Sequence, residues 1–245
     1  MNVGMAVLRP ARIVRLKPRG SMPYSTHPMK CTPFFPALPL LLAVLPGAGL
    51  HGQTPAAPSA IDFEKLAAGE VPGEFMAVEG NWAIAEDAGN KVAQLQPEPV
   101  ADAALLLGAS LKGAGTVSAR VKAGKSRRAF PRFGVGLHGV SGTKVRVVPA
   151  RKAIELVQGE NDAFATVAFD SWKEDTWWRV ELTLSEKDGA WTAEARLWPD
   201  GERRPDAATV AGKMPNPAAQ GKASLIGTPY AGKPILFDDV TAAAR

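Results

Sequence analysis

Cysteine and histidine are nearly absent from this sequence. Its 245 residues include one cysteine, Cys31, and three histidines. Beyond residue 53 there is no cysteine, and His138 is the single histidine. In that part of the chain this composition excludes disulfides, thiol catalysis, thiolate metal sites, and zinc or copper sites built from several histidines. A fold there must be stabilised by core packing.

A basic excess is also missing after the first 53 residues. Residues 1–53 carry six Lys and Arg and no Asp or Glu, so the rest of the chain keeps 23 of the 29 basic residues against 24 acidic ones. The net charge of that remainder is therefore −1. Binding to nucleic acid, or attraction to an anionic membrane, lacks the electrostatic support that it needs.

Motifs of two common enzyme classes are missing too. There is no Gly-x-Ser-x-Gly motif, and a Ser-His-Asp triad would have to use His138. No glycine-rich phosphate loop precedes a helical segment, so nucleotide chemistry has no support. His138 closes a strand-like segment beside Gly139, which favours a surface histidine, with a ligand contact as the alternative.

The first 53 residues have the order of a secretory signal. Lys30 gives a positive start, residues 34–45 form an apolar run broken by prolines, and small and polar residues follow at 47–53. This order predicts export, with a secreted or periplasmic location after cleavage, and translation from Met29 or an unusually long basic leader. The run is short for a permanent span, and a tethered N-terminus is the alternative. Cys31 precedes the run, whereas a lipoprotein cysteine follows it.

Beyond the leader, residues 54–60 predict a Pro/Ala linker and residues 61–245 predict one domain. In this domain apolar and polar residues alternate with a period of two, which is typical of strands with one buried face. Gly, Asn and Asp separate the segments. Ten or more strands at this spacing predict an all-β, two-sheet antiparallel sandwich of jelly-roll type. The clearest alternating segments are 116–122, 132–138, 144–147, 178–185 and 191–197.

Six short stretches across this domain carry a resemblance to a known fold family. They are residues 61–64 (IDFE), 78–82 (VEGNW), 131–137 (PRFGVGL), 172–180 (WKEDTWWRV), 195–202 (ARLWPDGE) and 237–240 (FDDV). Together they resemble the concanavalin A-like lectin/glucanase sandwich, in the LamG-like jelly-roll form common in secreted bacterial proteins. The resemblance implies a carbohydrate-binding or structural accessory role, although such a fold hosts unrelated activities.

Laminarinase-type enzymes of this family carry a Glu-x-Asp-x-x-Glu strand whose carboxylates attack the sugar and protonate the leaving oxygen. The nearest match begins at Glu160, has Ala165 in place of the last Glu, and follows Gly159 in a predicted turn. Residues 186–189 are a predicted hairpin tip. The catalytic strand is therefore absent, and we expect no enzyme of this type. Three carboxylates on polar strand faces keep another catalytic arrangement open: Glu155, Glu181 and Glu194.

Aromatic and charged residues out of phase with the core are the candidates for ligand binding. Trp178 and Trp191 are in phase with core residues and are predicted to be buried, whereas Trp177 and Trp198 are not. Sugar rings stack on exposed aromatic rings, and polar groups fix their hydroxyls. Ordinary amphipathic side chains are the alternative for each. The predicted binding set is Arg132, His138, Arg146, Trp177, Arg179, Glu181, Glu194, Arg196, Trp198 and Tyr230.

The resemblance also implies a metal option, because sandwiches of this family often hold a structural Ca²⁺ through oxygen ligands at their joined termini. The ligands it would use here are Asp62, Glu64, Asp238 and Asp239. In residues 236–240 the alternation places one aspartate inward or near the sheet edge, where it needs a partner. A hydrogen-bonded terminus explains this pattern as well as a metal does. No other cofactor is implied.

These observations give three functional hypotheses. The leading one is a secreted, non-catalytic carbohydrate-binding or cell-envelope accessory domain that binds a polysaccharide or glycan. Its concave face would carry Arg132, Arg146, Trp177, Arg179 and Trp198. The second is a glycoside hydrolase or lyase with rearranged carboxylates. The third is a structural protein-interaction module, which would show a large exposed apolar patch.

Overall fold

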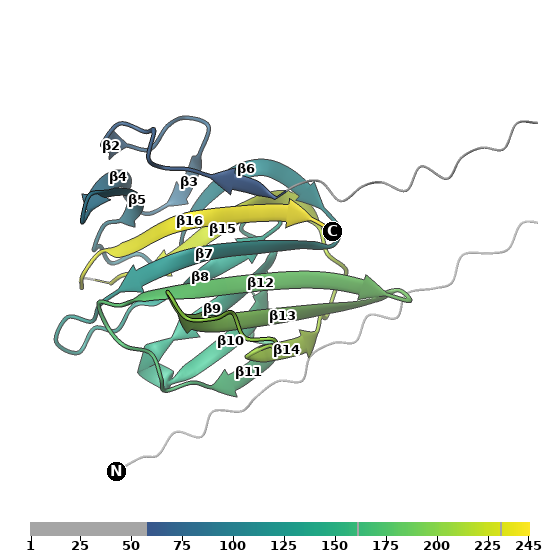
Figure 1. The fold of residues 1–245 in the computed structure, drawn as a ribbon. Coiled ribbons are helices and arrows are strands. Elements are labelled where there is room, and N and C mark those ends of the chain that lie inside the picture. The colour runs from purple at the N-terminus through teal and green to yellow at the C-terminus, as the bar shows by residue number, and fades with distance from the viewer. Residues whose placement is uncertain (1–57, 161, 231) are drawn as a thin grey trace, which may run out of the picture. The chain divides into compact units, whose positions relative to one another are not determined.

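The computed structural model describes residues 58–160, 162–230 and 232–245, which form two antiparallel β-sheets (Figure 1). Sheet A has nine strands, in the order β14-β13-β12-β7-β16-β5-β4-β2, with β1 paired to β16. Sheet B has seven, in the order β11-β10-β9-β8-β15-β6-β3. The predicted leader, signal and start site lie outside the described residues, as does most of the predicted linker.

The strands have the following bounds. Sheet A consists of β1 (Ser59–Ile61), β2 (Gly69–Glu70), β4 (Trp82–Asp87), β5 (Asn90–Leu95), β7 (Gly115–Ala123), β12 (Trp177–Lys187), β13 (Ala190–Pro199), β14 (Val210–Lys213) and β16 (Ile235–Ala244). Sheet B consists of β3 (Met76–Glu79), β6 (Ala103–Lys112), β8 (Arg132–Leu137), β9 (Thr143–Val148), β10 (Ala153–Gln158), β11 (Ala165–Ala168) and β15 (Gln220–Thr228). One 3-10 turn, η1 (Pro149–Arg151), joins β9 to β10. Within the described ranges, no helix has the length and hydrophobicity needed to cross a bilayer.

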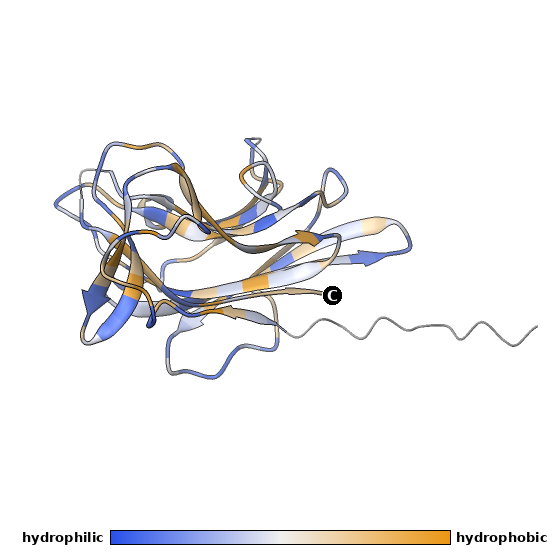
Figure 2. Cartoon of the chain, turned by 90° about the horizontal axis from the view of Figure 1, so that it is seen from above, coloured by the Kyte–Doolittle hydropathy of each residue, from blue (hydrophilic) through white to orange (hydrophobic). Residues whose placement is uncertain are grey.

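The period-two pattern produces the two layers. In β7, Val117, Ala119 and Val121 are buried, and Ser118 and Arg120 between them are half-buried on the opposite side. Successive side chains of a strand point to opposite faces, so the apolar faces of the two sheets can meet. Figure 2 shows these two layers, with hydrophobic stretches within the strands and hydrophilic residues at the loop tips. The predicted all-β jelly-roll sandwich is confirmed.

A continuous apolar core fills the space between the sheets. Phe63, Phe133 and Phe237 are at most 1% exposed. The rings of Trp82 and Phe237 pack with their centroids 5.6 Å apart. Complete burial of a large apolar side chain contributes about 1.5–3 kcal/mol. The core therefore supplies the stability that a domain without disulfides requires.

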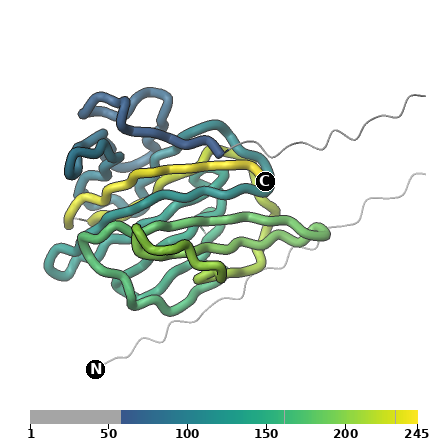
Figure 3. Tube along the Cα trace, viewed as in Figure 1, coloured from purple at the N-terminus to yellow at the C-terminus, as the bar shows by residue number. Residues whose placement is uncertain are grey.

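The path of the chain places two groups of strands in different sheets, an assignment that the sequence alone could not give (Figure 3). Strands β8, β9, β10 and β11 follow one another as a meander in sheet B. The chain then crosses to sheet A, where β12, β13 and β14 form a second meander. The segment that makes this crossing, residues 169–176, lies at one end of the sandwich and lines the cleft described below.

The structure corrects one predicted boundary and one predicted burial. Strand β1 begins at Ser59, inside the predicted linker, because its backbone pairs with β16 and aligns Ser59 with Ala242. Trp191, which was predicted to be buried, is half-buried, since it lies near the β12–β13 hairpin end and packs on the edge of the core. Trp178 is buried as predicted, with 4% exposure.

Candidate functional site

The predicted binding residues do not share one face. Arg132 and Arg146 leave the core side of sheet B, from β8 and β9. Trp177, Arg179 and Trp198 leave the core side of sheet A, from β12 and β13. The outward faces of two stacked sheets lie on opposite sides of a sandwich, so the predicted single binding face is wrong. Alternation shows which side chains leave the core, but it does not show which sheet a strand joins.

On sheet A the charged residues are bonded to one another. Arg179 donates from Nε to Asp200 at 2.7 Å and from Nη2 to Asp239 at 2.6 Å. Arg120 Nη2 lies 2.5 Å from Asp238 Oδ2 and Nη1 lies 3.4 Å from Asp200 Oδ2. Burial alone would raise the pKa of Asp200, but hydrogen bonds and charge from Arg179 and Arg120 outweigh it and lower this pKa. The network therefore stabilises the sheet rather than presenting free groups to a ligand.

The aromatic and acidic residues of this face are occupied in the same way. The Trp177 ring is covered by the guanidinium of Arg120, 4.5 Å from the ring centre, and by the ammonium of Lys122 at 5.1 Å. Trp198 is half-buried. The predicted residues Glu181, Glu194 and Arg196 form a second group, in which Arg196 lies 3.5 Å from Glu181 and 3.1 Å from Glu194. The Trp177 ring is therefore not an open stacking platform.

The four implied calcium ligands also have protein partners. Asp62 accepts a hydrogen bond from the Glu64 backbone N–H at 2.9 Å, and Glu64 accepts one from the Lys91 N–H at 3.0 Å. Asp238 and Asp239 are bonded to arginines as described above. In the part of the chain that the structure describes, no group of three or more His, Cys, Asp or Glu side chains is arranged to hold a metal ion. The hydrogen-bonded terminus accounts for the inward aspartate.

His138 is not a surface residue, which corrects the favoured interpretation. It is 4% exposed, its φ is +68°, and neither ring nitrogen has a hydrogen-bond partner among the described residues. The positive φ turns the chain directly after β8. Burial lowers the pKa of His138, and the nearby backbone of Gly113 offsets this effect only in part.

A pH-dependent stability follows from this burial. The imidazole of an unfolded chain binds a proton near pH 6.5, while the buried one resists it. The free energy of unfolding is therefore expected to fall as the pH drops below about 6.5, by at most about 1.4 kcal/mol per pH unit, and to level off below the folded pKa. Urea unfolding at pH 8 and pH 5.5 measures this slope. His138→Gln should remove it, and an unchanged slope in that variant would contradict the assignment.

Sheet B brings part of the predicted set together. The Arg132 guanidinium lies 5.8 Å from the ring centre of the exposed Tyr230, and Arg132 Nη2 donates to the Ala101 carbonyl at 3.1 Å. Arg146, on the neighbouring strand, lies 3.2 Å from Glu155, whose side chain is 3% exposed. Arg132 Nε and Arg146 Nε are buried and have no partner among the described residues. This face offers one exposed aromatic ring, Tyr230.

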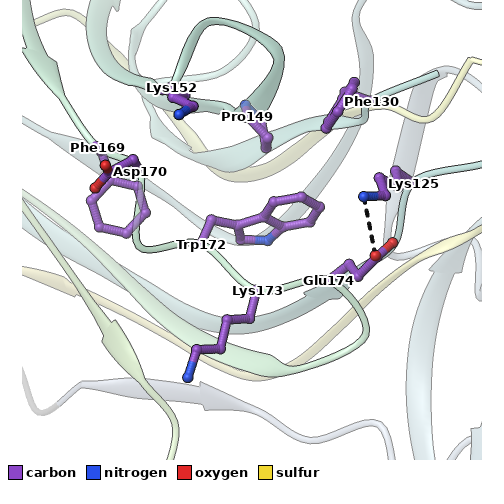
Figure 4. Close-up of a pocket in the computed structure, with 9 residues that line it drawn as sticks. All are labelled: Lys125, Phe130, Pro149, Lys152, Phe169, Asp170, Trp172, Lys173 and Glu174. Carbon is purple, nitrogen blue, oxygen red and sulfur yellow. Dashed lines mark ion pairs between the residues drawn. The ribbon is translucent and has the colours of Figure 1, made fainter. Parts of the chain in front are cut away.

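A cleft of about 400 Å³ lies at one end of the sandwich. It is lined by the connections between β7 and β8, between β9 and β10, and between β11 and β12. Figure 4 shows the Trp172 indole in the middle of the cleft, with Phe130 on one side and Phe169 on the other. Its size is in the range of small-molecule sites, about 300–1,000 Å³. The charged residues that line it are Lys125, Lys152, Asp170, Lys173 and Glu174.

The aromatic residues of this cleft are held in place by the core. Phe169 packs edge-on against Trp178, with ring centroids 5.6 Å apart and planes at 84°. Trp172 packs against Phe133 at 6.3 Å. The Trp172 Nε1–H is buried and has no acceptor among the described residues. The cleft thus combines fixed apolar surface with charged side chains, which suits a ligand that is apolar on one face and carries hydroxyls.

Sequence reasoning missed this site. Residues 172 and 173 were noticed for their resemblance to the fold family, but their role as a cleft wall was not predicted. Phe130, Phe169 and Trp172 lie in loops, where no alternation reports the direction of a side chain. The available signal was composition, because aromatic residues in polar loops are more informative than aromatic residues in strands.

The carboxylates that kept catalysis open are all paired with arginine. Glu155 is on sheet B, whereas Glu181 and Glu194 are on sheet A, so the three do not face one cleft. Guanidinium groups occupy oxygens that a general acid would present to a leaving group. The predicted turn at Glu160 and the predicted hairpin tip at 186–189 are confirmed. The ion pairs are Glu155 with Arg146 and Arg151, Glu181 with Arg196 and Arg204, and Glu194 with Arg196.

Solved structures share this fold. The carbohydrate-binding module CBM66 from Bacillus subtilis is 14% identical, with a TM-score of 0.50 over 70% of this chain and 96% of the module. Peanut lectin is 10% identical, with a TM-score of 0.51 over 77% of this chain and 97% of the lectin. The GH43 protein BlXynB from Bacillus licheniformis is 10% identical, with a TM-score of 0.50 over 75% of this chain and 39% of that protein.

These similarities show that the domain shares the jelly-roll sandwich fold of these proteins, in agreement with the fold that the sequence predicts. No protein-family model matches the chain, and no curated protein matches it in sequence. At this level of identity the comparison establishes the fold, and function must be argued from the cleft.

Proposed function

We propose that this protein is an exported, non-catalytic domain that binds carbohydrate in the cleft around Trp172. The observation that carries the proposal is a cleft whose fixed aromatic wall is formed by Phe130, Phe169 and Trp172 and whose rim is charged. A sugar ring presents an apolar face to aromatic side chains and hydroxyls to polar ones. The carbohydrate-binding module and the lectin of the same fold support this proposal.

A binding role without catalysis is supported by the state of the carboxylates. Two acids, Asp170 and Glu174, line the cleft, and Lys125 holds Glu174 at 3.3 Å, which leaves Asp170 as the single carboxylate there without an ion pair among the described residues. Glycoside hydrolysis uses two carboxyl groups on either side of the bond to be cleaved. Export is supported by the order of charge and hydropathy in residues 1–53, and the absence of cysteine after residue 53 suits a protein stabilised by its core.

The test is to replace the central ring and measure binding. We expect Trp172→Ala to weaken binding to a glycan retained by the wild type by about 30-fold, since a central aromatic contact contributes about 2 kcal/mol. Affinity electrophoresis against a panel of neutral and acidic polysaccharides selects the glycan, and calorimetry gives the affinity. Trp172→Phe should retain much of it.

Trp177→Ala is the matched control, because it removes a tryptophan from the outward face of sheet A. It is expected to leave affinity unchanged. A loss of binding in Trp177→Ala with none in Trp172→Ala would move the site to sheet A. Retention of no glycan by the folded wild type, as judged by circular dichroism, would contradict carbohydrate binding itself.

A further inference from the structure

The three connections around the cleft carry positive charge that the rest of the domain lacks. Residues 124–131, 149–152 and 169–176 contain six basic and three acidic residues, whereas the chain beyond residue 53 has a net charge of −1. An excess of one sign of charge around a cleft raises the local concentration of a ligand of the opposite charge. A local excess of this kind does not attract polyanions to the whole surface.

Among the described residues, ion pairs occupy two of the three acids of these connections and leave four of the six cations without one. Glu174 is paired with Lys125 at 3.3 Å, and Asp175 is paired with Lys233 outside these connections. Asp170 is the remaining acid. Four basic side chains of these connections have no ion pair among the described residues: Arg127, Arg128, Lys152 and Lys173. The two lysines line the cleft.

The β9–β10 turn, which borders the cleft, also borders a second pocket. Lys152 lines the cleft, and Arg151, one residue earlier, lines a pocket of about 350 Å³ on the outward side of sheet B. β11 and the residues around it border both, since Thr166 lines the second pocket and Phe169 lines the cleft. Three residues of extended chain span about 10 Å. The two hollows therefore lie within reach of one short oligomer.

The second pocket is lined by Asp162 and is built around a buried acid, Glu155, that orients two cations. Glu155 accepts from Arg146 Nη2 at 3.2 Å and from Arg151 Nη2. Its side chain is 3% exposed, while that of Arg151 is 64% exposed. The Arg146 Nε–H is buried and has no partner among the described residues. The buried carboxylate fixes both guanidinium groups, and the exposed Arg151 presents its remaining N–H groups to an incoming anion.

We propose that the carbohydrate is an acidic polysaccharide, with carboxylated sugars, that runs from the Trp172 cleft over the Arg151–Lys152 turn into the pocket beside Glu155. This inference rests on the proposed function and specifies its substrate class. One sugar stacks in the cleft, where Lys152 and Lys173 meet its carboxylate. Sugars further along the chain reach Arg151. Affinity then grows with chain length until the second pocket is filled, because the second contact is made within one complex.

The experiment compares the intact protein on uronic acid polymers and on the same polymers after carboxyl reduction. Polygalacturonate and alginate are the probes, and the reduced polymers keep the sugar backbone without its charge. We expect retention of at least one uronate, with binding at least about tenfold weaker to its reduced form, since charge-assisted hydrogen bonds differ from neutral ones by about this factor. Lys152→Ala with Lys173→Ala should cause a similar loss.

Oligosaccharides of different lengths test the contributions of the two pockets separately. Arg151→Ala is expected to weaken binding of oligomers of six or more sugars, while leaving trimers unchanged. Arg203→Ala, an exposed arginine paired with Asp206 on another loop, is the control and should change neither. Equal affinity for the uronate and its reduced form would overturn this inference while leaving carbohydrate binding intact. Retention of neither uronate, or equal retention of double-stranded DNA, would overturn it as well. If no polysaccharide of any charge is retained, the proposed function itself fails.

Discussion

Replacing Arg120 with methionine is expected to lower the free energy of unfolding by about 3 kcal/mol, because it leaves a carboxylate buried without its partner. Asp238 is 9% exposed in its side chain and accepts from Arg120 Nε at 3.2 Å and from Nη2 at 2.5 Å. Methionine keeps much of the aliphatic volume and removes the charge. Thermal unfolding should report a Tm about 6–12 °C lower, given 2–4 °C per kcal/mol for a domain of this size.

Two variants establish the cause of this loss. Asp238→Asn added to Arg120→Met removes the unpaired charge and should recover a large part of the stability. Arg203→Met breaks an exposed pair with Asp206 and should change the free energy of unfolding by less than about 0.5 kcal/mol. Unchanged stability in Arg120→Met, together with lost glycan binding, would contradict the structural role of this network and return the ligand site to sheet A.

The same network makes stability depend on acid. Because its arginine partners hold the pKa of Asp200 below the ordinary value, the ionised carboxylate stabilises the folded state above the unfolded pKa, near 4. That contribution is lost as the pH falls through the folded pKa. Arg120 contributes to the shift, so the Arg120→Met variant should show a shallower loss of stability below about pH 4.

The strands could be predicted from the sequence because burial of one face leaves a period of two. The segment 116–122 falls inside β7, and each of its apolar residues is buried. The pairing of strands left no such trace. Arg120 of β7 aligns with Asp238 of β16, although the two residues are 118 positions apart in the sequence. Their ion pair depends on a strand register that includes a bulge between Asp238 and Thr241. The sequence therefore does not point to Arg120, and it leaves a metal ligand and a hydrogen-bonded terminus as alternatives for Asp238.

The candidate site was out of reach for a related reason. Membership of a sheet decided that Arg146 and Arg179 lie on opposite sides, and that membership depends on long-range contacts. The cleft is built from three connections, and a connection carries no periodicity that could report where Phe130 or Trp172 points. Local patterns predict layers, whereas the convergence of loops at one end of a sandwich is a property of the topology.

Phe133→Ala is expected to lower both stability and glycan affinity, because Phe133 belongs to the core and also supports the cleft. Phe133 is 1% exposed, so its truncation opens a cavity and should lower the free energy of unfolding by about 3–5 kcal/mol. The Phe133 ring also supports Trp172, with their centroids 6.3 Å apart. An aromatic pair contributes about 0.5–1.5 kcal/mol, and its loss should weaken glycan binding by about 3- to 10-fold.

Phe63→Ala distinguishes this support from general destabilisation. Phe63 is equally buried, at 1%, but its ring packs against Phe75, with centroids 6.0 Å apart, and Phe63 does not line the cleft. Urea unfolding should show a similar loss of stability for both variants. Calorimetry under conditions where both are folded should show weaker binding for Phe133→Ala alone. Equal affinities in the two variants would mean that Trp172 is held by its own loop, and a loss in both would mean that the cleft responds to core stability in general.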